Sequence, residues 1–275
     1  MKKLILVAAM VLPLLVMAQR RPKIKGNRTV TEVRDELPPF NAIELNDDLD
    51  VRLKKSFGEG YEIVADDNLI DILKFEIVDS TLVISSYYTV TTKKQFDITI
   101  KYKELKAITV RDGKIKGEDE IAADALFLNV FGPAALEVRA NAFTIDLAME
   151  NTSKGEFWMD VDSLNVSLRN RSDANIYVAG GTSKVTLQDN GAVTMEGTTE
   201  DLELIAGSNT KFKGEKFETG NAKVQVDMAA VARVKALKTF ELASRDNAKT
   251  FLYGDPQIAV SEFMDTSQLV KKKSD

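Results

Sequence analysis

The chain of 275 residues contains no cysteine and no histidine. Without cysteine it can form no disulfide framework and cannot carry a lipid on a cleavage-site cysteine. Lacking both residues, it cannot use a Ser-His-Asp or Cys-His nucleophile, and an ordinary zinc site is excluded. We expect no cofactor. The enzymatic chemistry that remains depends on carboxylates, as in two-acid glycoside hydrolysis or a calcium-assisted lyase.

Long apolar runs and clustered positive charge are also scarce. After residue 18 no stretch is apolar enough to cross a membrane, so we expect no integral membrane segment. The formal net charge is -5, from 42 acidic and 37 basic side chains. The basic side chains are scattered except for Lys271-Lys272-Lys273, so nucleic acid is not an expected partner.

The N-terminus has the features of an export signal. Lys2 and Lys3 precede an apolar run over residues 4–16, and a small-residue cleavage site ends at Ala18. A membrane anchor is the alternative, but a span takes about 20 apolar residues. We predict a signal peptide over residues 1–18 and hence export to the periplasm or the cell surface.

What the chain does contain is a repeat of about nineteen residues between positions 108 and 252. Each copy has a short alternating stretch that ends on an apolar anchor, a turn rich in Asn, Asp, Gly or Ser, and a second apolar stretch. A fixed period of this length indicates stacked coils with the anchors inside. The predicted anchors are Val110, Val130, Met149, Leu168, Leu187, Leu204, Val226 and Leu242.

These patterns predict an all-β fold, a single-stranded right-handed parallel β-helix (a solenoid) with an N-terminal β-rich cap. We expect a flexible leader at 19–28, the N-terminal β-rich part of the solenoid at 29–104, the repeat solenoid at 105–260 and a polar tail at 261–275. Residues 68–77 are expected to form a short helical turn or a loop. Within 29–104, alternation predicts strands at 29–33, 40–45, 49–53, 61–64, 81–86 and 96–102.

Four motifs follow one another along nearly the whole mature length: Phe40-Asn41-Ala42-Ile43-Glu44-Leu45, Asp66-Asp67-Asn68, Leu82-Val83-Ile84 and Tyr253-Gly254-Asp255-Pro256. In this order they resemble the head GIN domains of autotransporter-adhesin-like secreted bacterial proteins. The resemblance implies a right-handed parallel β-helix, no firmly assigned biochemistry, and adhesion by analogy. The turns depart from the Ser-Gly-Ser-Gly corners of that family, as at Phe131-Gly132-Pro133. This departure puts a shared turn-based ligand site in doubt, but not the fold.

Two acidic turns are candidates for a calcium site or an acid pair. Asp47, Asp48 and Asp50 share one turn, and Asp66 and Asp67 lie in another. Because aspartate is a common turn former, a solvated turn is the interpretation that the sequence favours.

The outward residues that precede the anchors are predicted to form a row along the surface. This row contains only two acids, and a glutamine separates them, so it predicts no catalytic face of adjacent carboxylates. The chain is therefore expected not to be an enzyme. The predicted row is Thr109, Asn129, Ala148, Ser167, Thr186, Glu203, Gln225 and Glu241.

A second outward row contains two aromatic residues, Trp158 and Tyr177, nineteen positions apart. Identical register makes them neighbours about 4.8 Å apart across the sheet. Two such rings could stack on a sugar. The alternative, which the sequence favours, is an aromatic ladder that only stabilises adjacent coils. The full predicted row is Glu137, Trp158, Tyr177, Thr194, Lys211, Arg233 and Phe251.

Two short motifs resemble sites at which some bacteria O-glycosylate exported proteins. Asp79-Ser80-Thr81 and Asp162-Ser163-Leu164 both have the pattern of aspartate, hydroxyl residue and small or apolar residue. Ser80 and Ser163 are therefore candidate modification sites, although three-residue patterns also arise by chance.

The sequence thus favours an exported, non-enzymatic β-solenoid that serves as a binding or adhesion-like module, with carbohydrate or a cell-envelope protein as partner. A carboxylate-dependent polysaccharide-active enzyme, either lyase or glycosidase, is one alternative. A ligand-free scaffold is another. Acids that converge on one groove beside a basic residue would distinguish the enzyme from the other two.

Overall fold

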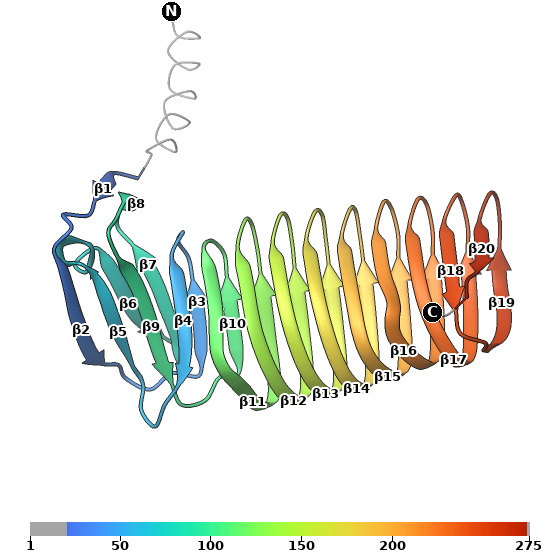
Figure 1. Cartoon of the computed structure of the whole chain (residues 1–275), viewed down its shortest axis with the longest axis horizontal. Coiled ribbons are helices and arrows are strands. Elements are labelled where there is room, and N and C mark those ends of the chain that lie inside the picture. The colour runs from blue at the N-terminus through green and yellow to red at the C-terminus, as the bar shows by residue number, and fades with distance from the viewer. Residues whose placement is uncertain (1–20, 274–275) are drawn as a thin grey trace, which may run out of the picture.

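The computed structural model describes residues 21–273, which form an elongated β-solenoid of about nine turns (Figure 1). In this part of the chain there is no α-helix, and the one helical element is a 3-10 turn, η2 (Asp67–Leu69). The predicted all-β solenoid is therefore confirmed. No helix of residues 21–273 is long and apolar enough to cross a membrane. The signal peptide predicted at residues 1–18 lies outside the described residues.

Each coil of the solenoid consists of one long bent strand and one tight turn. Because each long strand bends near its middle, its first half lies in one sheet, the leading sheet, and its second half in the opposite one, the trailing sheet (Figure 1). The long strands pair parallel in chain order: β11 (Lys114–Val130), β12 (Ala135–Met149), β13 (Lys154–Leu168), β14 (Asp173–Leu187), β15 (Ala192–Ala206), β16 (Lys211–Val226) and β17 (Val231–Ser244).

Strand pairing confirms the predicted anchor row as far as Leu187 and corrects it beyond. Leu204 and Leu242 lie two residues before the anchor position, on the same inward face. The true anchors there are Ala206 and Ser244, whose side chains are too small or too polar for hydrophobicity to identify. The observed row is Val110, Val130, Met149, Leu168, Leu187, Ala206, Val226 and Ser244.

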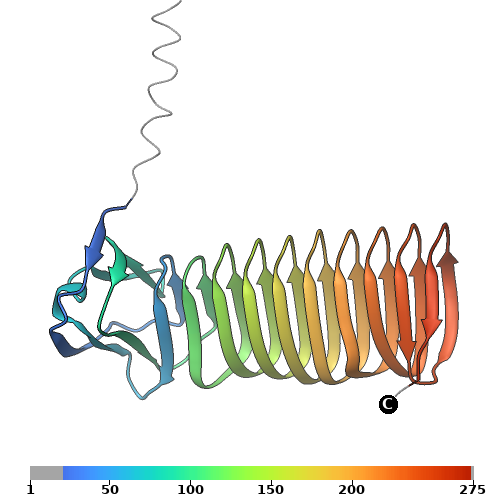
Figure 2. The same ribbon diagram turned by 45° about the horizontal axis from the view of Figure 1, so that its top comes forward.

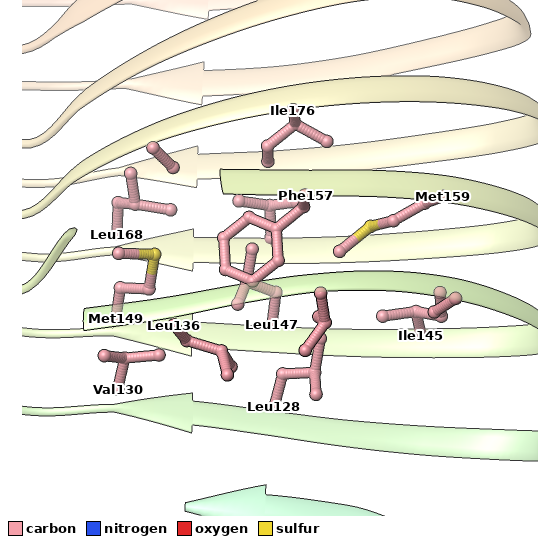
Figure 3. Packing of buried hydrophobic residues seen from close by; sticks show 14 of the residues in the cluster. Leu128, Val130, Leu136, Ile145, Leu147, Met149, Phe157, Met159, Leu168 and Ile176 are labelled. Atoms are coloured by element: carbon pink, nitrogen blue, oxygen red, sulfur yellow. The ribbon is translucent and has the colours of Figure 1, made fainter. Parts of the chain in front are cut away.

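Inward residues fill the space between the two sheets from coil to coil. Val130, Met149 and Leu168 lie one above the next, with the ring of Phe157 beside them (Figure 3). All four are at most 1% exposed. Burial of a side chain of this size stabilises the fold by roughly 1.5–3 kcal/mol, so the repeated rows supply most of the stability.

The turn after each anchor contains one residue in the left-handed region. Only a residue without a large side chain, or one that bonds its own backbone, adopts this conformation easily. This confirms the expected corner chemistry, with Met228 as the exception. The left-handed residues are Gly113, Gly132, Asn151, Asn170, Asp189, Ser208, Met228, Asp246 and Asp265.

The N-terminal end is closed by antiparallel strands. Strands β3 and β4 pair parallel with β10 and β11, and β7 and β9 continue the two sheets. Beyond them, β5 and then β2 extend the leading sheet, and β6 extends the trailing sheet, each antiparallel to its neighbour. The six strands predicted within residues 29–104 are present. The cap strands are β2 (Val30–Glu36), β3 (Ala42–Leu45), β4 (Asp50–Lys55), β5 (Gly60–Asp66), β6 (Leu73–Val78), β7 (Thr81–Ser86), β9 (Phe96–Tyr102) and β10 (Ala107–Val110).

Strands also occur in segments that were expected to be irregular. In the expected leader, β1 (Lys23–Lys25) pairs with β8 (Thr89–Thr92). In the expected polar tail, β20 (Gln268–Lys271) pairs with β18 (Lys249–Tyr253), while β19 (Gln257–Phe263) pairs with β17. Strands of three or four residues, such as β1 and β20, are too short for alternation to identify them from the sequence. The two ends of the rod therefore differ: a β-rich block closes the first, and single parallel strands form the last (Figure 2).

Candidate functional site

Trp158 and Tyr177 lie side by side on the outer face of the leading sheet, on β13 and β14. They are direct partners in the parallel register, as predicted. Trp158 is 39% exposed and Tyr177 is 52% exposed, whereas their neighbours Phe157 and Ile176 are buried. Strand alternation therefore sends the flanking side chains into the core and leaves both rings on one outward strip. We call Trp158 and Tyr177 the aromatic strip.

The two rings of the aromatic strip do not stack on one another. Among residues 21–273 the only stacked ring pair is Tyr61 and Phe75. Trp158 instead contacts a cation, because the Arg139 guanidinium lies 5.4 Å from its ring centroid. The Arg139 guanidinium thus lies over the Trp158 ring, and among residues 21–273 no aromatic ring stacks on Tyr177.

A shallow depression of about 270 Å³ surrounds the aromatic strip. Its rim carries the donors and acceptors that sugar hydroxyls require: two carboxylates, one amide and one threonine hydroxyl. This rim was not predicted from the sequence, because its members come from three consecutive strands whose exact register was unknown. The lining residues are Glu156, Phe157, Trp158, Asn175, Ile176, Tyr177, Thr194 and Glu196.

The same face contains one pair of adjacent carboxylates, contrary to expectation. Glu137 was predicted to lie beside Trp158, but it pairs with Glu156, and Arg139 takes the predicted place. Lys116 and Lys114 reach the Glu137 carboxylate at 2.5 and 3.3 Å. The hydrogen bond from Lys116, supported by Lys114, lowers the pKa of Glu137. Two-acid glycoside hydrolysis requires one carboxyl group with a raised pKa. Glu137 is therefore unsuited to act as the general acid.

The outward row on the trailing sheet also differs in detail from the prediction. Glu203 and Glu241 occupy one row, but Lys223 lies between them, and Gln225 belongs to the neighbouring row. Lys184 precedes Glu203 in this row and forms an ion pair with it at 3.2 Å. Charges of opposite sign thus alternate along this row of the trailing sheet, and the row holds no adjacent acids.

Asp66 is not a solvated turn residue, because its carboxylate binds backbone N–H groups inside the cap. Its side chain is fully buried and accepts hydrogen bonds from the backbone N–H groups of Arg28, Lys94 and Gln95 at 3.1–3.3 Å. Burial opposes ionisation, but these donors outweigh it and lower the pKa of Asp66. Asp66 therefore fastens the segment before β2 and the loop before β9 to the end of β5.

Asp47 has a similar structural role at the next turn. It is 5% exposed, accepts a hydrogen bond from the backbone N–H of Ser86 at 2.7 Å, and forms an ion pair with Arg21. Within residues 21–273, no group of three or more Asp, Glu, His or Cys side chains could hold a metal ion. The solvated-turn interpretation is thus wrong for Asp47 and Asp66.

The two candidate modification sites lie in different environments. Ser80 is exposed in the tight turn between β6 and β7, with a φ of 61°. Ser163 is partly exposed in the middle of β13, between Thr144 and Thr182 of the adjacent coils. Ser163 lies on the same strand as Trp158, five residues further along, and glycosylation of either serine stays a prediction.

Solved structures share this architecture at low sequence identity. A putative adhesin from Parabacteroides merdae matches with a TM-score of 0.68 and 14% identity, over 91% of this chain and 99% of that one. A putative adhesin from Parabacteroides distasonis matches with a TM-score of 0.65 and 14% identity, over 91% and 100%. A putative lipid binding protein from the same organism matches with a TM-score of 0.62 and 14% identity, over 91% and 99%. None of the curated proteins matches the sequence.

A family model also matches the sequence itself. The model described as putative auto-transporter adhesin, head GIN domain, matches residues 39–157 and again residues 155–256. The two matches together span the cap, the repeat coils and the Tyr253-Gly254-Asp255-Pro256 corner, and so cover most of the chain. The protein therefore belongs to the head GIN domain family of putative auto-transporter adhesins.

Proposed function

We propose that the protein is an exported, non-enzymatic binding module of the cell envelope, acting in the periplasm or at the cell surface, and that the aromatic strip binds carbohydrate. The observation that carries this proposal is the pair of half-exposed rings, in register but not stacked on each other, within a polar rim. The signal peptide expected at residues 1–18 and membership of an adhesin family support the location.

The side chains around the aromatic strip match the two needs of sugar recognition. The apolar face of a sugar ring stacks on an aromatic ring, and its hydroxyls need fixed donors and acceptors. Asn175 offers both, and Glu156 and Glu196 accept hydrogen bonds. Glu196 is held by an ion pair with Lys216 at 3.3 Å, which fixes one acceptor in place.

Carbohydrate fits this site better than lipid. The solved structure from Parabacteroides distasonis that is described as a putative lipid binding protein shares only the fold with this chain, at 14% identity. An acyl chain requires an enclosed apolar cavity. Here the depression is open and shallow, and the rows of buried side chains fill the space between the sheets (Figure 3). A flat aromatic surface with a polar rim suits a glycan instead.

The site also supports binding rather than catalysis. The Glu137 carboxylate, next to Glu156, is held ionised by two lysines, and the chain lacks the histidine and cysteine that most hydrolases use. We therefore expect no cleavage of pectin, alginate or peptidoglycan strands. Reproducible cleavage that one Asp→Asn or Glu→Gln change abolished would overturn this expectation.

A glycan array with the purified protein tests the proposal, followed by tryptophan fluorescence titration of the parent and calorimetric titration of the parent and the variants. Trp158 is the only tryptophan, so a sugar that stacks on it changes the whole tryptophan signal. We expect Trp158→Ala and Tyr177→Ala each to weaken binding of the selected glycan at least about fivefold, because stacking of a nucleic-acid base on one aromatic ring contributes about 1–3 kcal/mol and we expect a similar contribution from a sugar ring.

Phe143→Ala is the matched control, since Phe143 is an exposed aromatic residue, 68% accessible, outside the aromatic strip. It should leave glycan binding unchanged. If the double variant of Trp158 and Tyr177 stays folded and binds as well as the parent, the strip has only a structural role. If no glycan binds at all, the ligand-free scaffold is the better description.

A further inference from the structure

The edge strands at the two ends of the solenoid differ in charge. At the N-terminal end, β2 carries Glu32, Arg34, Asp35 and Glu36 among its seven residues. Charged edge strands are the usual protection against pairing with another chain. At the C-terminal end, β19 has the sequence QIAVSEF, with a single charge. The other C-terminal edge strand, β20, ends in one charge, Lys271. The N-terminal edge is thus protected against strand pairing, and the C-terminal edge is protected far less.

Core residues of the last coil are left uncovered. Ile258, Val260 and Phe263 continue the inward rows of Phe240, Leu242 and Ser244, which are at most 1% exposed. In β19 the same row positions are 47%, 49% and 50% exposed, since no further described strand lies over them. A solenoid normally ends in a polar cap that keeps its core from water. On β19 this end has the apolar surface of an interior coil, whereas on β20 Lys271 continues the inward row of Leu252.

We propose that the C-terminal end, formed by β19 and β20, docks on the same end of a second copy of the chain, with a two-fold axis between them. Strands β19 and β20 run in opposite directions, because they continue the two halves of a bent coil. A two-fold axis perpendicular to the solenoid then places each edge strand antiparallel to an edge strand of the partner. Both open edges and the uncovered core rows become paired at once.

A head-to-tail filament is the competing arrangement, and the charges on β2 oppose it. Such a filament would place the apolar edge of β19 and β20 against an N-terminal end closed by antiparallel strands. Charged side chains on β2 would then lose water without matched partners, which costs free energy. The C-terminal end of a second copy presents the less charged edge, with Glu262 on β19 and Lys271 on β20, so the contact closes after two chains.

The area of this end suits a dimer of moderate strength. A seven-residue strand is about 24 Å long, and the sheets stack about 10 Å apart, with side chains widening the section to about 20 Å. Each copy then buries about 500 Å², or roughly 1,000 Å² in total, near the lower limit for specific interfaces. The dimer should therefore dissociate on dilution. This inference is independent of the proposed glycan site.

Sedimentation velocity over a range of concentrations tests the proposal with the purified protein. We expect a reversible monomer–dimer equilibrium that Val260→Lys weakens at least tenfold. Val78→Lys is the matched control, because Val78 is 54% exposed on β6, an edge strand at the opposite end. It should leave the equilibrium unchanged. Circular dichroism of each variant checks that the solenoid is intact.

A single spin label provides a geometric readout that does not depend on a destabilising charge. Since the chain has no cysteine, Val260→Cys creates one labelling site. In the dimer two labels at position 260 lie close together and show strong dipolar coupling. Labels at position 78, introduced by Val78→Cys, lie at the two outer ends of the dimer and show none. A protein that stays monomeric at every concentration, a filament that grows without limit, or coupling at residue 78 instead of 260 would each overturn the proposal.

Discussion

At the scale of single residues, the turns show where local strain is concentrated. Met228 has a φ of 53° at a turn position that otherwise holds Gly, Asn, Asp or Ser. A left-handed conformation costs an ordinary L-residue roughly 1–2 kcal/mol. We therefore expect Met228→Asn to stabilise the fold by about 1 kcal/mol, because asparagine bonds its own backbone in this region. The urea midpoint measures the gain.

Met264→Asn is the control for that substitution. Met264 is also an exposed turn methionine, 56% accessible against 54% for Met228, and it is not among the residues with positive φ. The same change of side chain there should leave the urea midpoint nearly unchanged. An equal gain at both positions would mean that polarity, and not backbone strain, is responsible.

Asp66 makes the stability of the cap depend on pH. Its folded-state pKa is lowered below the ordinary 3.8, so the ionised form stabilises the fold. This contribution is complete above the unfolded-state pKa and is lost as the pH falls through the lower folded-state pKa. We expect Asp66→Asn to lower the free energy of unfolding at neutral pH and to flatten its decline below about pH 4. Urea unfolding at several pH values measures both effects, and parallel pH curves would contradict the assignment.

At the scale of the element, a glycine next to a phenylalanine on the inward face of the same strand leaves room for the ring. The ring of Phe157 folds over Gly155, and a Cβ built on that glycine would lie 2.2 Å from the Phe157 ring. Overpacking of this kind typically costs 1–3 kcal/mol. We expect Gly155→Ala to destabilise the protein by about 2 kcal/mol in thermal or urea unfolding.

Gly58→Ala provides the comparison for Gly155→Ala. Gly58 lies in the turn between β4 and β5, and a Cβ there meets no atom within 4 Å. The same added methyl group should therefore be neutral. If Gly155→Ala is equally neutral, the Phe157 ring has another rotamer available, and the core between these coils is looser than the packing indicates.

At the scale of the whole molecule, the solenoid separates its tasks along one axis. The antiparallel cap closes one end, the aromatic strip lies on the leading sheet of the central coils, and the open edge of β19 and β20 forms the other end (Figure 1). Because each coil contacts only its neighbours, a change at one end has little direct effect on the strip. Val260→Lys should therefore leave glycan affinity per chain unchanged, while a dimer would gain from binding two glycan chains together.

Much of this fold follows from the sequence by itself. The period of about nineteen residues, the inward anchors up to Leu187, and the Asn, Asp, Gly and Ser corners are local or strictly repeated properties, so that they are visible without coordinates. The placement of Trp158 beside Tyr177 was predictable for the same reason, since two consecutive coils of equal length keep their register.

Only the tertiary structure decided what depends on unequal coils and distant partners. The anchor steps after Leu187 are 19, 20 and 18 residues, and irregular pairing absorbs the differences at the bends. Leu204 and Leu242 were misassigned because hydrophobicity favours a leucine over the small Ala206 and Ser244 two residues later. Glu137 was placed beside Trp158, although its partner is Glu156, nineteen residues later. The burial of Asp66 likewise depends on backbone donors about thirty residues or more away. Strand alternation is set by neighbouring residues, whereas register and burial are set by whichever segment the chain brings alongside.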